Sequence, residues 1–241
     1  MKRSFFRKHA TAYLGALTLL CLAHIPTFAA NTSIASTHIY VVKKDGTDQA
    51  TTLQKELHTF YTKQAGFIGS FVLEDTKDAT IRQDYSFWKD MASFNNARAK
   101  AKTLASQQTL ASITERIVSD QIGNTHGGTH HREAELGKAV VEMAVFNLKR
   151  PFNEGFLPVR ATVKEWLDHH RGSNGYITLP STSDSKQMAD VVLWTNLDDA
   201  LYAANLLGHL DFGQRLNNEI SGMTYYGHFN IHAQYFKQGL H

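Results

Sequence analysis

The sequence contains one cysteine, Cys21, and it lies in an amino-terminal segment with the pattern of a secretory signal peptide. Residues 1–30 combine a basic start, an apolar run from Tyr13 to Ala23 and small residues at Thr27 and Ala29. These small side chains place the expected cleavage after Ala29. The exported chain would carry no thiol, which excludes disulfides, thiolate catalysis and cysteine metal ligands. From the signal-peptide pattern we expect a periplasmic or secreted protein.

Long apolar runs are also missing. The run from Tyr13 to Ala23 is shorter than the roughly 20 residues that a helix needs to cross a bilayer, so we expect removal rather than anchoring. Lipidation at Cys21 is the less favoured alternative, because Leu20 before it is too large for a good lipoprotein signal. After removal of the signal we expect no membrane association.

An excess of charge of one sign is missing too. Four of the 25 Lys and Arg residues, and none of the 22 Asp and Glu residues, lie in the first 30 positions. The remainder therefore has 21 basic residues against 22 acidic ones and is close to neutral. This balance gives no argument for a nucleic-acid partner, and we expect none.

Several motifs that mark common enzyme classes do not occur. The sequence has no P-loop, no dinucleotide-binding glycine fingerprint, no HExxH and no nucleophile elbow. Three histidines, His126, His130 and His131, lie in a glycine-rich stretch without an acidic residue until Glu133. Nothing in this stretch identifies further residues that would orient the histidines around a metal ion, so we expect no metal site there.

What the sequence does contain is an internal repeat. The stretch from Gly66 to Phe94 returns in looser form from Gly175 to Tyr202. Each copy has a Gly-aromatic-Ile opening, a polar turn, a strand with Asp and Trp four positions apart, and a helix that opens with acidic residues. Repetition at a separation of roughly a hundred residues predicts a duplicated domain.

Each copy has the order of elements βαββαβ. In the first copy, residues 37–124, we expect strands at 38–43, 67–74, 80–88 and 119–124 and helices at 50–64 and 90–118. After a linker at 125–138, the second copy at 139–233 has expected strands at 139–148, 175–179, 188–195 and 223–231. Its helices are expected at 152–169 and 197–207, with an irregular segment at 208–220. This is the ferredoxin-like order, so the predicted class is α+β with two tandem ferredoxin-like domains.

Four short motifs of the second copy carry a resemblance to a known family. They are Glu142-Met-Ala-Val-Phe146, Gly175-Tyr-Ile177, Val191-Val-Leu-Trp194 and Leu197-Asp-Asp-Ala200. In this order the chain resembles the antibiotic biosynthesis monooxygenase-like family of dimeric α+β barrels, and the first copy matches more loosely. The resemblance implies that two sheets pair through their open faces, with helices outside, either within one chain as a pseudo-dimer or as a homodimer.

The same resemblance implies an activity. Members oxidise small aromatic or polyketide-like compounds, often without a bound metal or flavin, and a related branch degrades haem. Asn147 matches the asparagine that this branch has on its first strand, but Tyr202 and His209 do not form its Trp and His pair. We therefore do not expect haem, and we keep Asn147 as a candidate substrate-binding residue.

The repeated strand supplies four more candidate ligand-binding residues. Strand alternation places Asp84 with Trp88, and Asp190 with Trp194, on one face. Such a face can line a pocket in the barrel, with each Trp stacking on a planar aromatic ligand and each Asp orienting a hydroxyl group. In the alternative interpretation each Trp plugs the end of the barrel, and each Asp caps a turn or pairs with an Arg.

The last strand supplies the candidate catalytic residues. Tyr226, His228 and Asn230 share one face of it. A neutral imidazole at His228 can remove a phenolic proton, with Tyr226 or Asn230 as hydrogen-bond partner, and the resulting anion can react with oxygen. A solvated histidine at a strand end is the alternative.

Two functional hypotheses follow. The first is an exported monooxygenase-like enzyme that oxidises a small aromatic or quinone-like compound without a cofactor. The second is a noncatalytic periplasmic protein that binds small hydrophobic ligands in the same barrel.

Overall fold

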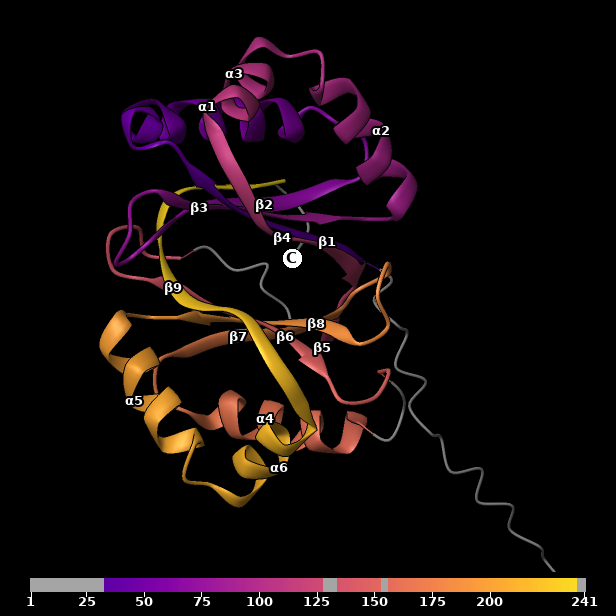
Figure 1. Ribbon diagram of the computed structural model, residues 1–241, viewed down its shortest axis with the longest axis vertical. Coiled ribbons are helices and arrows are strands. Elements are labelled where there is room, and N and C mark those ends of the chain that lie inside the picture. The colour runs from indigo at the N-terminus through magenta and orange to yellow at the C-terminus, as the bar shows by residue number, and fades with distance from the viewer. Residues whose placement is uncertain (1–32, 128–133, 153–155, 238–241) are drawn as a thin grey trace, which may run out of the picture. The chain divides into compact units, whose positions relative to one another are not determined.

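The computed structural model describes residues 33–127, 134–152 and 156–237 (Figure 1). The segment expected to be a signal peptide lies outside these residues, as do His130, His131 and Glu133 of the predicted linker. No helix within the described ranges is both long enough and apolar enough to span a membrane.

The first copy of the repeat folds as one four-stranded antiparallel sheet with helices on one face. Its elements are β1 (Ile34–Val42), the 3-10 turn η1 (Lys44–Gly46), α1 (Thr47–Thr62), β2 (Phe67–Asp75), β3 (Ile81–Trp88), α2 (Met91–Ala101), α3 (Ala105–Ile113) and β4 (Thr114–Asn124). The strand order is β4-β1-β3-β2. Helix α1 buries Ala50, Gln54, Leu57 and His58, whose spacing places them on one face of the helix.

The second copy repeats this arrangement. Its elements are β6 (Val140–Leu148), α4 (Leu157–His169), β7 (Ser173–Pro180), β8 (Gln187–Trp194), α5 (Leu197–Leu207), α6 (Asp211–Glu219) and β9 (Ile220–Phe236), and the strand order is β9-β6-β8-β7. The predicted α+β class with two tandem ferredoxin-like units is confirmed.

Equivalent positions of the two copies differ by 106 in residue number. Ile34 pairs with Trp88 in the first copy, and Val140 pairs with Trp194 in the second. The irregularities of the ladders also recur at this offset, including the shift after Ile39 in the first copy and after Val145 in the second. A residue of one copy can therefore be compared directly with its counterpart in the other.

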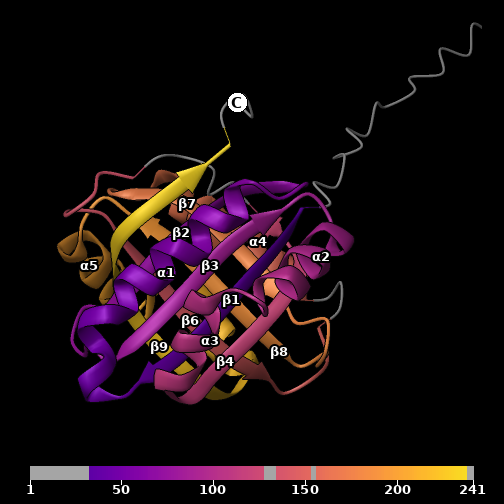
Figure 2. The same cartoon turned by 90° about the horizontal axis from the view of Figure 1, so that it is seen from above.

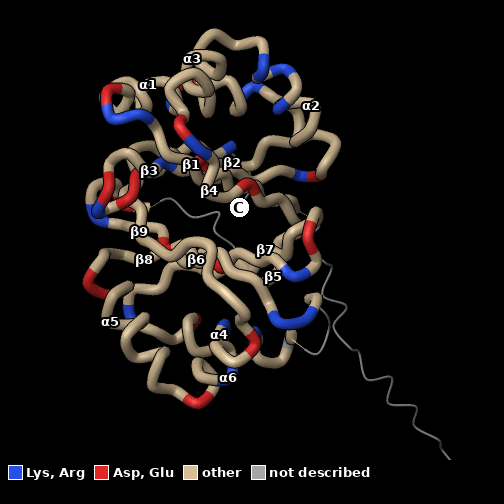
Figure 3. Tube along the Cα trace, viewed as in Figure 1, with Lys and Arg blue, Asp and Glu red and all other residues tan. Residues whose placement is uncertain are grey.

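The two copies exchange strand ends. Strand β9 continues past the second sheet, and residues 229–236 pair with β2 of the first copy. In the other direction, the short strand β5 (His126–Gly127), which follows β4, pairs with Thr178 and Ile177 of β7. The copies thus pair within one chain as a barrel, with α1–α3 outside one sheet and α4–α6 outside the other (Figures 1, 2 and 3).

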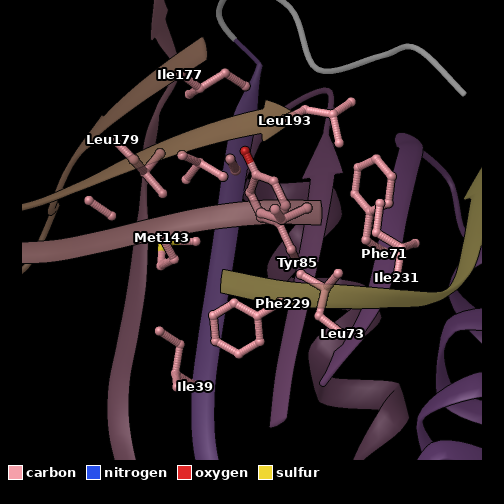
Figure 4. Close-up of a cluster of buried hydrophobic side chains, with 14 of the residues drawn as sticks. Ile39, Phe71, Leu73, Tyr85, Met143, Ile177, Leu179, Leu193, Phe229 and Ile231 are labelled. Atoms are coloured by element: carbon pink, nitrogen blue, oxygen red, sulfur yellow. The ribbon is translucent and has the colours of Figure 1, made fainter. Parts of the chain in front are cut away.

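The faces that the two sheets turn toward each other carry the largest hydrophobic cluster (Figure 4). Tyr85 of the first copy is fully buried in this cluster, together with Met143 and Phe229 of the second copy. Smaller clusters lie between each sheet and its helices. Burial of these apolar side chains on both faces of the sheets is the main source of stability.

Three details of the prediction were wrong. The segment expected to be one helix at 90–118 forms two helices, α2 and α3, and the second ends at Ile113 because the chain enters β4 at Thr114. The segment expected to be irregular at 208–220 contains α6, whose glycine and two asparagines give it a weak helical signal although Leu216 is buried. The strand expected at 223–231 is nearly twice as long, because its ends pair with both sheets.

The register of the repeat also needs correction. The sequence suggested that Gly66 corresponds to Gly175, but the strand pairings make Gly172 its counterpart and align Gly175 with Gly69. Gly66 and Gly172 both adopt left-handed backbone conformations, with φ of 75° and 80°, immediately before β2 and β7. Glycine is favoured in this conformation, so the connection from helix to strand has the same backbone conformation at its end in both copies.

Candidate functional site

The repeated Asp and Trp residues lie on the sheet face that is covered by helices, not in the barrel interior. Trp88 is fully buried and packs with Phe67 and Phe94 between the first sheet and its helices. Trp194 is buried in the same way in the second copy. The expected pocket in the barrel interior is therefore misplaced, because alternation shows which residues share a face but not which face the helices cover.

A cavity of about 560 Å³ lies between the first sheet and α1–α3. We call it the first cavity. Its polar lining consists of Ser36, His38, Tyr40, Tyr61, Asp84, Ser86, Arg98, Lys102, Gln107, Thr114, Glu115, Arg116 and Asp120. Leu57, Phe94 and Leu110 contribute apolar walls. Such a volume is within the range of pockets that bind small organic molecules.

His38 lies between two carboxylates in this cavity. It is opposite Asp84 on β3 and opposite Asp120 on β4 in the strand register. Its Nδ1 is buried and lies 3.4 Å from Asp120 Oδ1, an ion-pair distance without a well-aligned hydrogen bond. Its Nε2 has no hydrogen-bond partner among the described residues and is not buried. The Nε2 atom of His38 can therefore form a hydrogen bond with a ligand in the cavity.

Asp120 is held in its ionised form. Arg98 Nη2 donates a hydrogen bond of 2.8 Å to Asp120 Oδ2. The interaction with His38, together with that of Arg98, outweighs partial burial and lowers the pKa of Asp120 to about 2. At neutral pH the carboxylate beside His38 is an anion.

Asp84 is the second anion beside His38, and its carboxylate is held by two side chains of α1. Gln54 Nε2 donates a hydrogen bond of 3.0 Å to Asp84 Oδ1, and His58 Nε2 is 3.0 Å from the same oxygen. Burial by itself would raise the pKa of Asp84, but His58, then His38 and Gln54, lower it below its ordinary value. The buried His58 Nδ1 has no partner, so donation from Nε2 accounts best for this contact.

Two tyrosines complete the polar wall. Burial and the Asp84 carboxylate raise the pKa values of both Tyr40 and Tyr61, so both hydroxyls stay protonated at neutral pH. The Tyr40 hydroxyl is buried and has no hydrogen-bond partner in the described part of the chain. The first cavity thus combines an accessible imidazole nitrogen, two carboxylates and a free phenolic donor.

The second copy has a smaller cavity, of about 190 Å³, at most of the equivalent positions. We call it the second cavity, and it includes Glu142, Arg160, Asp190, Trp194 and Tyr226. Arg160 Nη2 is 2.5 Å from Asp190 Oδ1, and both side chains are buried. Burial raises the pKa of Asp190, and Arg160 offsets only part of this effect. Pairing of an Asp with an Arg was one of the two interpretations of this residue.

Of the three candidate catalytic residues of β9, the structure brings together Tyr226 and His228, whose ring centroids are 5.6 Å apart, but not Asn230. His228 is buried, and its Nε2 is 3.3 Å from Glu142 Oε2, which also accepts a hydrogen bond of 3.1 Å from Trp194 Nε1. Tyr226 is 46% exposed at the rim of the second cavity. Asn230 is exposed and does not line either cavity. His228 is therefore a buried histidine at ion-pair distance from Glu142, with no well-aligned hydrogen bond at Nε2, rather than a solvated strand end.

Asn147 also lies apart from both cavities. It is near the end of β6, opposite Gln187 and Gly222 in neighbouring strands. Its backbone oxygen accepts a hydrogen bond from Ser221. The described residues contain no group of three or more His, Cys, Asp or Glu side chains that could hold a metal ion.

Sequence reasoning missed most of the first cavity. His38, His58, Arg98 and Asp120 lie on four different elements, and only Asp84 was among the candidates. A signal was present in β1, where Ser36, His38 and Tyr40 alternate with the apolar residues of a strand. Pairing of β1 with β4 was needed to show that Asp120 faces His38.

Comparison with known proteins supports the fold. No family model matches the sequence, and no curated protein matches it. Among solved structures, a candidate monooxygenase from Fusobacterium nucleatum has a TM-score of 0.68 at 12% identity, over 86% of this chain and 95% of that one. An anthrone oxidase-like protein has a TM-score of 0.64 at 10% identity, over 85% and 93%. A candidate chlorite dismutase has a TM-score of 0.60 at 9% identity, over 83% and 95%.

These similarities cover nearly the full length of the other chains. The protein shares the fold of these structures, in which two ferredoxin-like α+β units in tandem pair as one barrel. Identities near 10% establish the fold alone, because one fold can carry several activities.

Proposed function

We propose that the protein is an exported oxygenase that acts without a cofactor on a small aromatic or quinone-like compound bound in the first cavity. The observation that carries this proposal is the environment of His38. Its Nδ1 faces the Asp120 carboxylate, and its Nε2 is free at the wall of a cavity of about 560 Å³. A histidine positioned by a carboxylate, with its other nitrogen open to a ligand, suits a general base.

The first step is removal of a proton from the substrate. A phenolic O–H, or an activated C–H next to an aromatic ketone, gives its proton to His38 Nε2. The imidazolium that forms is flanked by the anions Asp84 and Asp120, which stabilise it. The unpartnered Tyr40 hydroxyl is a hydrogen-bond donor for the oxygen that becomes negative on the substrate.

The electron-rich anion then reduces molecular oxygen. For a substrate with a CH₂ group between aromatic rings, one oxygen atom becomes the new C=O and the other leaves as water with the two hydrogens. The substrate itself supplies the electrons, so the overall reaction is balanced without another reductant. Arg98 lines the cavity and carries the positive charge closest to Asp120, where it can also stabilise negative charge on the reduced oxygen.

The experiment measures oxygen uptake by the purified protein with a panel of anthrones and hydroquinones, in the presence of a chelator. We expect His38→Ala and His38→Gln to lower turnover by about 10²- to 10⁴-fold, the usual contribution of a general base. His209→Ala is the control, because this histidine is exposed between α5 and α6.

Two outcomes would contradict the proposal. Saturable binding of the aromatic compounds without oxygen uptake would support the noncatalytic carrier instead. Turnover that survives His38→Ala but is lost in His228→Ala would move the base to the second copy. Melting curves of each variant separate loss of activity from loss of fold.

A further inference from the structure

The two cavities occupy equivalent places but have different chemistry. Ala144 replaces His38, and Tyr226 replaces Asp120. The second cavity thus lacks both the base and the carboxylate that positions it. Proton abstraction of the kind proposed for the first cavity has no equivalent group here, so any function of the second cavity is a different one.

The second cavity nevertheless retains polar groups suited to a ligand. Glu142 lines it, and while its Oε2 contacts Trp194 and His228, its Oε1 has no hydrogen-bond partner in the described ranges. Arg160 is 5% exposed and also lines the cavity. Its Nη1 is buried without a hydrogen-bond partner, although Nη2 contacts Asp190. One acceptor and one buried donor therefore remain available.

The remaining wall is largely apolar and aromatic. Trp166, Tyr176, Trp194 and Phe146 contribute rings, and Val163 and Leu216 contribute aliphatic side chains. An apolar cavity of about 150 Å³ can bind benzene in another protein. A volume of about 190 Å³ therefore admits one substituted aromatic ring and excludes the larger compounds that the first cavity can hold.

We propose that the second cavity is a noncatalytic binding site for a single-ring phenol that carries a second oxygen substituent, with catechol as the simplest example. The phenolic hydroxyl donates to the Glu142 carboxylate, and the second oxygen accepts a hydrogen bond from Arg160 Nη1. Both interactions involve charged groups in a mostly buried environment, where an unpaired donor is costly. This site does not depend on the activity proposed for the first cavity.

The test is calorimetric titration of catechol into the purified protein. The first cavity can also take small phenols, so the comparison is made in a His38→Leu background. There Ala144→Leu places a larger side chain in the second cavity, and we expect it to abolish the remaining binding. Glu142→Gln keeps the size of the side chain but removes its charge, and we expect the dissociation constant to rise roughly tenfold or more. His38→Leu is the matched control at the equivalent position of the first cavity, and catechol binding should persist in it.

The outcomes separate the two cavities. Binding that is kept in His38→Leu, and is then lost when Ala144→Leu is added and weakened when Glu142→Gln is added, supports the proposal. Absence of binding to the unaltered protein, or binding lost in His38→Leu, overturns it. If Ala144→Leu does not fold by circular dichroism, Glu142→Gln alone decides, because an unchanged dissociation constant in that variant also overturns the proposal. Oxygen uptake by Ala144→Leu tests the first cavity separately.

Discussion

Gln54 and Arg160 occupy the same position of α1 and α4, and each contacts the aspartate of its own copy. Gln54 Nε2 donates a hydrogen bond to Asp84, whereas the Arg160 guanidinium forms a buried ion pair with Asp190. A neutral amide leaves the Asp84 charge available to the neighbouring His38. A guanidinium compensates the charge of Asp190. Together with the replacement of His38 by Ala144 and of Asp120 by Tyr226, this difference separates a cavity suited to proton transfer from one that contains an internal ion pair.

The first prediction compares the two aspartates. Asp84→Asn should lower turnover by roughly tenfold or more, because His38 loses one of the anions that stabilise its protonated form. Asp190→Asn should leave turnover nearly unchanged but lower the free energy of unfolding by about 3 kcal/mol, because Arg160 stays buried without its partner. Oxygen uptake and urea unfolding measure the two effects. The reverse result would place the reaction in the second copy.

The second prediction concerns acid stability. The pKa of Asp120 is about 2 in the folded protein, below its ordinary value of 3.8. The ionised carboxylate therefore stabilises the fold fully above pH 3.8, and this contribution is lost as the pH falls through 2. The difference in urea midpoint between the unaltered protein and Asp120→Asn should be largest above pH 4 and should shrink toward pH 2. A difference that does not depend on pH would contradict this assignment.

The third prediction concerns a hydrogen bond between the two copies. Tyr225 of β9 donates a hydrogen bond of 2.5 Å to Asp75 Oδ2, at the end of β2. Tyr225→Phe should lower the free energy of unfolding by about 2 kcal/mol, because the bond involves a carboxylate. The neighbouring Tyr226 hydroxyl has no hydrogen-bond partner among the described residues, so Tyr226→Phe is the matched control. Equal effects of the two substitutions would show that this bond contributes little.

The fourth prediction concerns export. When the full-length protein is expressed in a secreting bacterial host, we expect a periplasmic or secreted product that begins at Ala30. Intact mass and amino-terminal sequencing identify the start of the purified chain. A product recovered only in the cytoplasm with residues 1–29 attached would contradict the signal peptide.

The sequence by itself indicated the α+β class and the duplication. Repetition of Asp and Trp at 84 and 88, and again at 190 and 194, is a local pattern, and so are the alternating strands and amphipathic helices around it. Local patterns survive folding because they reflect which side chains share a face of one element. For the same reason the sequence correctly grouped Asp84 with Trp88 on one face.

The tertiary structure decided which face the helices cover, and with it the position of both cavities. His38 and Asp120 are far apart in the chain and become neighbours only because β1 pairs with β4 in one particular register. The tertiary structure also decided that β9 pairs with both sheets, which no pattern within β9 indicates. Strand pairing depends on the whole sheet, so a single sequence can supply the residues of such a site without showing that they meet.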